Sequence, residues 1–245
     1  MRSGTAPPTA IPPAREQPRQ RRGARFVEIA AIAAHPDDSE SWCAGTLAHA
    51  VDMGPTVRLL LVTSGDNGSS DPSATAQSVA RQREQEARAA AALLGISEVA
   101  FLSHPDAAVE DTVTLRREVV ATIRRWRPAV VFTHDPVHPN PPYTSHRDHR
   151  VVGRVALDAV YPLARDRLCF PDLEADGLAP HTVLEVWLFA SDRPTNFVDI
   201  KTGFDRKIAA RLEHKSQTAD AAALRQAWRE RFMTVGKDAG VELAE

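Results

Sequence analysis

Two short segments of this sequence combine histidine and aspartate, which offer the nitrogen and oxygen donors that zinc accepts. The first reads His-Pro-Asp-Asp at 35–38, and the second reads His-Arg-Asp-His at 146–149. A catalytic zinc ion takes three protein ligands and keeps one position for water. His35 and Asp38 flank a turn that proline stiffens, and His149 is the natural third ligand. The pattern therefore predicts one metal site built from both segments.

Three further groups would lie beside this predicted metal site without binding the ion. Asp37 and His146 offer a carboxylate and an imidazole, which can act as base and acid in metal-assisted amide hydrolysis. Asp148 could orient a histidine through its second ring nitrogen. Each segment alone also has a structural explanation, because aspartate caps helices and His-x-x-His pairs are common on exposed helices. Finding both segments after predicted strands favours the metal site.

The elements that would position these segments alternate along the chain. Apolar runs typical of strands buried on both faces are found at 26–33, 56–63, 99–102, 129–133 and 183–189. Helices are predicted at 39–53, 77–94, 112–127, 146–161 and, as one or two helices, within 204–236. This alternation predicts an α/β, Rossmann-like fold with a mainly parallel sheet and helices on both faces. Ligands bind such sheets outside the carboxyl ends of the strands, where both segments would lie.

Length and composition indicate one domain preceded by a different kind of segment. A chain of 245 residues can bury a single sizeable core, so residues 25–245 are predicted to form one domain. Residues 1–24 alternate proline with arginine and have little to bury, which predicts a disordered basic tail. The formal net charge of −2 gives no general attraction for nucleic acid, and no apolar run is long enough to span a membrane.

The cysteines and the start of the chain indicate where the protein works. Cys43 and Cys169 are far apart and in no metal-binding spacing, so two unpaired thiols in a reducing cytoplasm are expected. The basic segment at the start lacks the apolar stretch of a secretory signal. We therefore expect a cytoplasmic protein whose partner is a small molecule.

The two His/Asp segments resemble the motifs of the LmbE/PIG-L-like N-acetylglucosaminyl de-N-acetylases. That family has an HPDD motif after its first strand and an HxDH-type motif later, and both are intact here. The resemblance covers most of the chain and includes Thr-Ser-Gly-Asp at 63–66, Arg83, Glu86, Leu-Gly at 94–95, Pro-Asp at 105–106, Lys207 and His-Lys-Ser-Gln at 214–217. The family usually has glutamate at the position of Asp66, and the segment 39–45 departs from its paired glycines.

The resemblance implies a role for each residue of the predicted site. It implies His35, Asp38 and His149 as ligands of Zn²⁺, with other divalent metals possible, Asp37 as general base, and His146 as general acid or oxyanion-side cation. The implied activity is removal of an acyl group, usually acetyl, from the nitrogen of a sugar or glycoconjugate. Whether Asp37 handles both proton transfers or shares them with His146 stays open. Relatives are frequently oligomeric, which makes a homo-oligomer possible.

Four more side chains are candidates for substrate contact: Asp66, Arg83, His134 and Tyr143. Arg83 could bind hydroxyls or a phosphate, or could form a surface salt bridge within its arginine-rich helix. His134 ends the fourth predicted strand and could instead make a local hydrogen bond in the loop. Tyr143 precedes the second segment, where some relatives have a tyrosine that polarises the carbonyl, although its spacing differs here by one residue.

Other functions are compatible with parts of this pattern. Mycothiol-type deacetylases and conjugate amidases share the motifs, so a zinc amidase acting on a mycothiol-type conjugate or a natural-product amide is the main alternative. A non-catalytic sugar- or metal-binding module is less favoured, because it would have little need for Asp37. A nucleotide-binding Rossmann domain would need a glycine-rich segment after the first strand, where His-Pro-Asp-Asp stands instead.

Overall fold

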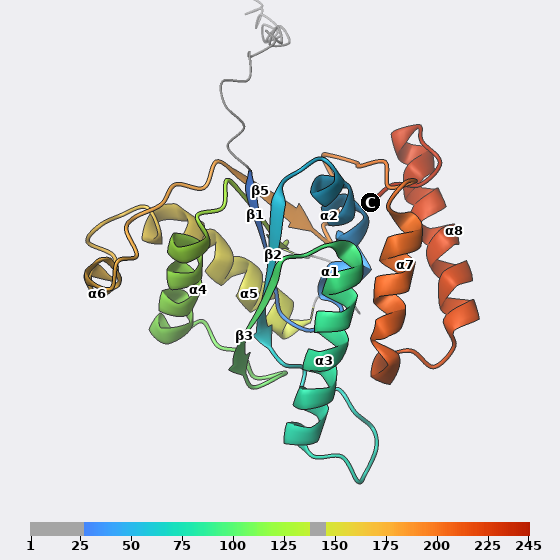
Figure 1. Cartoon of the computed structure of the whole chain (residues 1–245), viewed down its shortest axis with the longest axis horizontal. Helices are drawn as coiled ribbons and strands as arrows, with labels where there is room; N and C mark the ends of the chain where they lie inside the picture. Colours follow the sequence, from blue (N-terminus) through green and yellow to red (C-terminus); the bar gives the residue numbers. More distant parts are fainter. Residues whose placement is uncertain (1–26, 138–145) are drawn as a thin grey trace, which may run out of the picture.

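The computed structural model describes residues 27–137 and 146–245, and it has a central sheet between two layers of helices (Figure 1). The strands of these two ranges are β1 (Glu28–Ala33), β2 (Thr56–Thr63), β3 (Glu98–His104), β4 (Val130–His134) and β5 (Glu185–Phe189). They form one five-stranded sheet in the order β3-β2-β1-β4-β5, and each neighbouring pair is parallel. The predicted α/β, Rossmann-like fold is confirmed.

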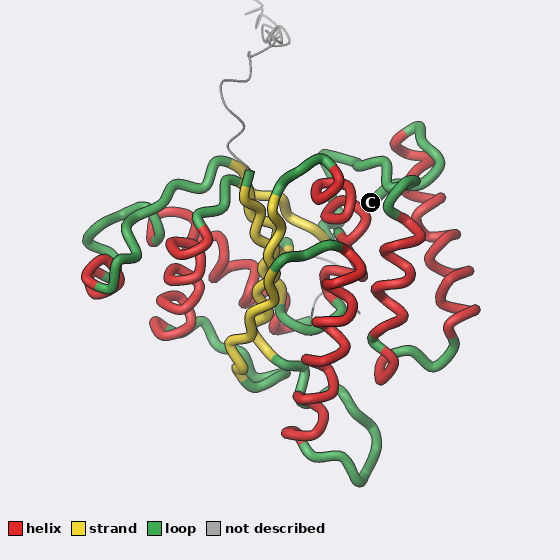
Figure 2. Tube along the Cα trace, in the orientation of Figure 1, coloured by secondary structure: helices red, strands yellow, loops and turns green. Residues whose placement is uncertain are grey.

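Helices lie on both faces of the sheet (Figure 2). One face is covered by α1 (Asp38–Trp42), α2 (Ala44–Asp52), α3 (Ala76–Leu94) and α7 (Phe204–Glu213). The other face is covered by α4 (Val113–Trp126) and α5 (Arg147–Asp158). Successive residues of a strand point to opposite faces, so Ala31 and Ala33 join the first core while Ala30 and Ile32 join the second. This double burial explains why the strands read as continuous apolar runs.

The last part of the chain adds a second layer outside α7. α8 (Ala221–Ala239) follows a short 3-10 turn, and Phe232 of α8 packs with Phe204 and Ile200 in a small separate core. The predicted helical region within 204–236 is therefore two helices. Shorter elements are α6 (Pro171–Ala175) and a π-helical turn at Ala159–Leu163, which continues α5.

Several helix ends lie where the sequence places them. Gly95 ends α3 with a φ of 78°, a left-handed conformation that glycine adopts without a Cβ penalty. The Thr112 side chain accepts a hydrogen bond from the Leu115 amide at 3.1 Å and so begins α4. His146 is the residue at which α5 begins, and its Nδ1 accepts from the Asp148 amide at 3.2 Å.

The helix predicted over 39–53 differs from the structure because it is divided into α1 and α2 at Cys43. The φ of Cys43 is −134°, outside the helical range. The residue that precedes the first turn of α1 is Asp37 rather than Ser39. The Asp38 side chain accepts a hydrogen bond from the His35 amide at 2.7 Å and closes the turn before the helix. Residue 45 lies so close to Ile200 that a Cβ would come within 2.8 Å of it, which is why only glycine allows this packing.

Some predictions concern parts of the chain that the structure does not cover. The tail at 1–24 and Tyr143 lie outside the described residues. Cys43 and Cys169 are both free, as predicted, and Cys43 is buried. Within 27–137 and 146–245, none of the helices combines the length and the apolar character that crossing a membrane requires.

Candidate active site

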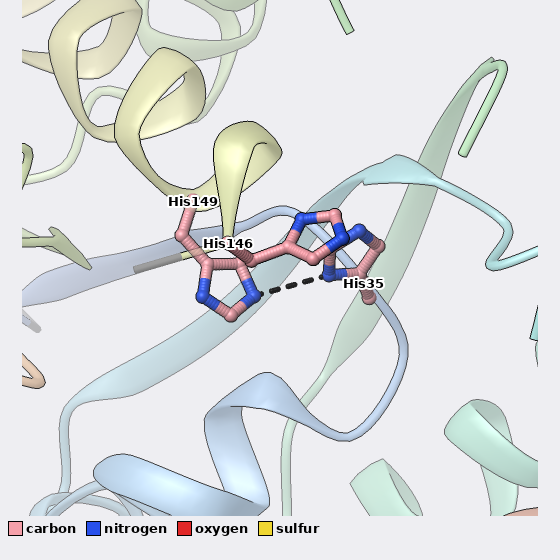
Figure 3. A group of neighbouring side chains, drawn as sticks. All are labelled: His35, His146 and His149. Carbon is pink, nitrogen blue, oxygen red and sulfur yellow. Dashed lines mark hydrogen bonds between the residues drawn. The ribbon is translucent and has the colours of Figure 1, made fainter. Parts of the chain in front are cut away.

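The sheet order brings the two His/Asp segments together. β1 and β4 are parallel neighbours, so the segment that follows β1 meets the start of α5 at the same edge of the sheet. His35 Nδ1 lies 3.1 Å from His149 Nε2, although 114 residues separate them in the sequence (Figure 3). His146 lies beside both rings, with its centroid 4.8 Å from that of His35.

Donor atoms of His35, Asp38 and His149 lie close enough together to bind one metal ion. His149 Nε2 is 3.0 Å from Asp38 Oδ1, and His35 Nδ1 is 3.5 Å from Asp38 Oδ2. Tetrahedral coordination with metal–ligand distances of about 2.0–2.1 Å places neighbouring donors roughly 3.3 Å apart. The spacing and the two-nitrogen, one-oxygen donor set therefore fit zinc or a similar divalent ion. Within the described residues, three overlapping groups have the spacing to hold a metal ion: His35 with His146 and His149, Asp38 with His134 and His149, and His35 with Asp106 and Asp148.

Asp38 is held on its buried side by His134. The Nε2 atom of His134 lies 3.2 Å from Asp38 Oδ2, and its ring stacks on that of His149 with centroids 4.1 Å apart. Burial alone would raise the pKa of Asp38, but interactions with His149 and His134 hold this pKa well below its usual value. Asp38 therefore stays ionised, as a metal ligand must. His134 is buried behind the ligands, so substrate contact by its side chain stays a prediction.

Two carboxylates face the other nitrogen of His35. His35 Nε2 is 3.0 Å from Asp106 Oδ1 and 3.3 Å from Asp148 Oδ2. Burial would lower the pKa of His35, but these carboxylates and Asp38 raise it to about 12. A metal ion at Nδ1 would displace the proton there while Nε2–H still faces the carboxylates, which is the usual arrangement around histidine ligands. The carboxylates that raise the pKa of His35 would also favour a bound cation.

Asp148 itself is fixed by the backbone that follows β3. It accepts hydrogen bonds from the amides of Ala107 at 2.7 Å and Val109 at 3.3 Å. Its position beside His35 is the orienting arrangement that the sequence predicts. Asp106 was missed as a site residue, although it follows β3 directly and so lies at the same carboxyl edge. Its position after a strand end was the signal that could have identified it.

Asp37 lies between two arginines. Its Oδ1 is 3.4 Å from Arg83 Nη2, and its Oδ2 is 3.6 Å from Arg211 Nη2. Burial, and then the charge of Asp38, raise the pKa of Asp37, while the arginines and His214 partly offset this rise. A carboxylate with a raised pKa and 20% exposure of its side chain can receive a proton from a nearby water.

Arg83 and Asp66 make their bonds within the protein. Arg83 is buried and donates to the carbonyl oxygens of Pro36 at 2.8 Å and Gly65 at 3.0 Å, so it ties the turn after β1 to the loop after β2. Asp66 Oδ1 accepts from the Asp106 amide at 3.0 Å. Both residues therefore shape the site, and their contact with substrate stays a prediction.

His146 is on the open side of the site. It is exposed, and burial of part of its ring and the neighbouring charge of His35 lower its pKa. His146 immediately precedes the first residue of α5, and its ring points towards His35 rather than into the core (Figure 3). An imidazole in this position can contact a substrate that approaches the candidate metal ligands from solvent.

Comparison with known proteins gives consistent matches. The sequence profile of the GlcNAc-PI de-N-acetylase family (PIG-L) matches residues 30–160, which contain both His/Asp segments. Diacetylchitobiose deacetylase of Thermococcus kodakarensis is 33% identical over 190 residues, 78% of this chain and 70% of that protein. The 1D-myo-inositol 2-acetamido-2-deoxy-alpha-D-glucopyranoside deacetylase of Mycobacterium sp. (strain KMS) is 28% identical over 232 residues, 78% of this chain and 74% of that protein. The structure of N,N'-diacetylchitobiose deacetylase from Pyrococcus horikoshii has a TM-score of 0.83 and 28% identity, covering 90% of this chain and 82% of that one.

Proposed function

This chain belongs to the GlcNAc-PI de-N-acetylase (PIG-L) family, and we propose that it is a zinc-dependent hydrolase that removes the acetyl group from the nitrogen of an N-acetylglucosamine-type sugar or glycoconjugate. The observation that carries the proposal is the convergence of His35, Asp38 and His149, whose donor atoms lie 3.0–3.5 Å apart. The names of the two curated relatives support the substrate class, because both act on N-acetylated amino sugars.

Zinc is the proposed metal because one carboxylate and two imidazoles are a ligand set that zinc accepts, and three protein ligands leave a position open for chemistry. A divalent ion held by His35, Asp38 and His149 would lower the pKa of a water and polarise the acetyl carbonyl. The residues around these ligands are then expected to move the protons and stabilise the developing charge.

Asp37 is the proposed general base. Its carboxylate lies beside the ligands without joining them, and its raised pKa lets it take a proton from the attacking water. His146, on the open side, is placed to donate a hydrogen bond to the carbonyl oxygen as negative charge develops there. The proton that reaches the departing nitrogen then comes from Asp37 or from His146. The products are acetate and the free amine of the sugar.

The finer assignments rest on the family. A diacetylated disaccharide and an N-acetylglucosamine–inositol conjugate are the two substrates that the relatives suggest. Substrate contact by Tyr143, the cytoplasmic location and a homo-oligomeric state stay predictions from the sequence.

The experiment is amine release by the purified chain from N-acetylglucosamine, diacetylchitobiose and the inositol conjugate. It is run on the protein as purified, after chelation, and after zinc is restored, with Asp37→Asn as the variant. We expect activity that disappears with the chelator and returns with zinc. The variant should bind zinc normally but react roughly 10²–10⁴-fold more slowly, the usual contribution of a general base.

Two other results would change the proposal. Tight zinc binding without amine release from any of the three sugars would reject this substrate class, and a panel of conjugate amides would follow. Failure to bind any divalent ion would reject the site itself.

A further inference from the structure

Helix α7, which precedes the last helix of the chain, reaches the candidate general base. α7 packs beside α1 and α2, and the close approach of Gly203 to the backbone of Gly45 fixes it there. This packing places Arg211, in the last turn of α7, with its Nη2 atom 3.6 Å from Asp37 Oδ2. Asp37 is thus contacted from α3 by Arg83 and from α7 by Arg211.

The two arginines are held in different ways. Arg83 donates to two carbonyl oxygens, those of Pro36 and Gly65, and so fixes the backbone of the turn. The hydrogen bonds of Arg211 run to the segment after its own helix, to Thr218 Oγ1 at 2.7 Å and to the Gln217 carbonyl at 3.3 Å. The contact of Arg211 with the turn after β1 is therefore made through the Asp37 carboxylate.

Burying the guanidinium of Arg211 costs free energy unless an opposite charge lies beside it. Arg211 is 8% exposed. A guanidinium removed from water loses free energy of hydration, which its hydrogen bonds and an opposite charge must offset. The carboxylate that Arg211 faces is Asp37, and the side of the guanidinium away from it is fixed by Thr218 and Gln217.

We propose that Arg211 is a positioning residue, which holds the Asp37 carboxylate in the orientation that accepts a proton from the attacking water. The inference rests on the proposed function of Asp37 as general base. Arg83 sets the backbone of the turn and donates a hydrogen bond to Asp37 Oδ1 at 3.4 Å, while Arg211 faces Oδ2 at 3.6 Å from the other side, so the direction of the side chain depends on both arginines. Loss of Arg211 should leave the metal ligands in place and misdirect only the base. Misplacement of a catalytic group by about 1 Å can cost 10²-fold in rate.

The test compares Arg211→Gln, Arg211→Lys and Arg206→Gln in the full, zinc-loaded chain. Arg206 is the matched control, because it lies on the same helix but pairs with Asp52 and with the Ala48 carbonyl of α2, away from the site. The measurements are kcat and KM for sugar deacetylation, zinc affinity, thermal unfolding, and crystal structures of the wild type and Arg211→Gln.

We expect kcat of Arg211→Gln to fall roughly 10- to 100-fold, with KM and zinc affinity within about twofold of the wild type. Arg211→Lys should recover part of the loss, and Arg206→Gln should lower the unfolding temperature without lowering kcat. In the crystal structure of Arg211→Gln, the Asp37 carboxylate should adopt another rotamer while His35 and Asp38 stay in place.

Four results would overturn the inference: an unchanged kcat, a rise in KM instead of a fall in kcat, an equal fall in kcat in Arg206→Gln, or an unmoved Asp37 in the variant structure. The structural comparison separates this inference from the proposed function. If the wild type deacetylates no sugar, the proposed function fails by itself, while the rotamer of Asp37 still decides whether Arg211 positions it.

Discussion

Asp148→Asn should weaken metal binding although Asp148 is not among the expected ligands. The carboxylate faces three N–H groups: those of Ala107 and His35 meet Oδ2, and that of Val109 meets Oδ1. An asparagine of the same shape has one acceptor oxygen and one NH₂ group. In either orientation its NH₂ group faces at least one N–H donor, so at least one hydrogen bond is lost.

The magnitude follows from what is lost. If the amide oxygen takes the place of Oδ2, the Val109 bond, at 3.3 Å, is the one that disappears. Losing one hydrogen bond to a charged group costs about 1.5–3 kcal/mol of stability. His35 also loses a negative charge that orients its ring, and such partners typically contribute 10- to 100-fold to metal affinity, or ~1.4–2.7 kcal/mol.

The assay is zinc titration against a competing chelator, with thermal unfolding of the apo and zinc-loaded forms. The increase in unfolding temperature on adding zinc should shrink in the variant, because stabilisation by a ligand grows with its concentration relative to Kd. Glu118→Gln is the control, since Glu118 pairs with a different histidine, His104, away from the ligands. A zinc affinity of Asp148→Asn within twofold of the wild type would refute the orienting role.

Two further predictions test the packing around the site and the pH dependence of stability. Gly153→Ala should lower both the unfolding temperature and the zinc affinity, because a Cβ there would overlap the carbonyl oxygen of His134 and push α5, with the proposed ligand His149, away from β4. An unchanged affinity would show that α5 accommodates the methyl group. Burial lowers the pKa of His181 below 6.5, and its ring donates to the Pro128 carbonyl. The folded state therefore disfavours protonation, so the free energy of unfolding should fall as the pH drops from 6.5 towards the folded pKa. His181→Gln should flatten this part of the stability profile in urea unfolding, and an identical slope in both proteins would contradict the reasoning.

The sequence predicted the fold and the meeting of the two His/Asp segments because both depend on local patterns. Continuous apolar runs indicate strands buried on both faces, and the alternation with helices indicates parallel pairing. The position of residues 35–38 and 146–149 after predicted strands then predicts their meeting at one edge of the sheet. The structure places His35 beside His149 at that edge.

The contacts that the sequence could not predict depend on packing between distant elements. The placement of Arg211 beside Asp37 requires α7 to pack on α1 and α2, and nothing in the local pattern of α7 sets that geometry. The packing of Ile200 against Gly45 likewise joins distant parts of the chain. His134 ends β4, as predicted, but only the structure shows its ring behind Asp38 rather than in the open site.

Asp37 and Asp38 are consecutive residues whose environments separate their chemistry. The pKa of Asp38 is lowered because its carboxylate faces imidazoles, whereas the pKa of Asp37 is raised by burial and by the charge of Asp38. Carboxyl pairs whose pKa values are pushed apart can divide their roles, which agrees with the proposal of Asp38 as an ionised ligand and Asp37 as a proton acceptor. The backbone allows this division because Asp37 has a φ of 89°, an uncommon left-handed conformation for a residue with a Cβ. With that conformation, the Asp38 side chain lies against His149 and His134, and the preceding one, of Asp37, lies against Arg83 and Arg211, so the turn itself separates the proposed ligand from the proposed base.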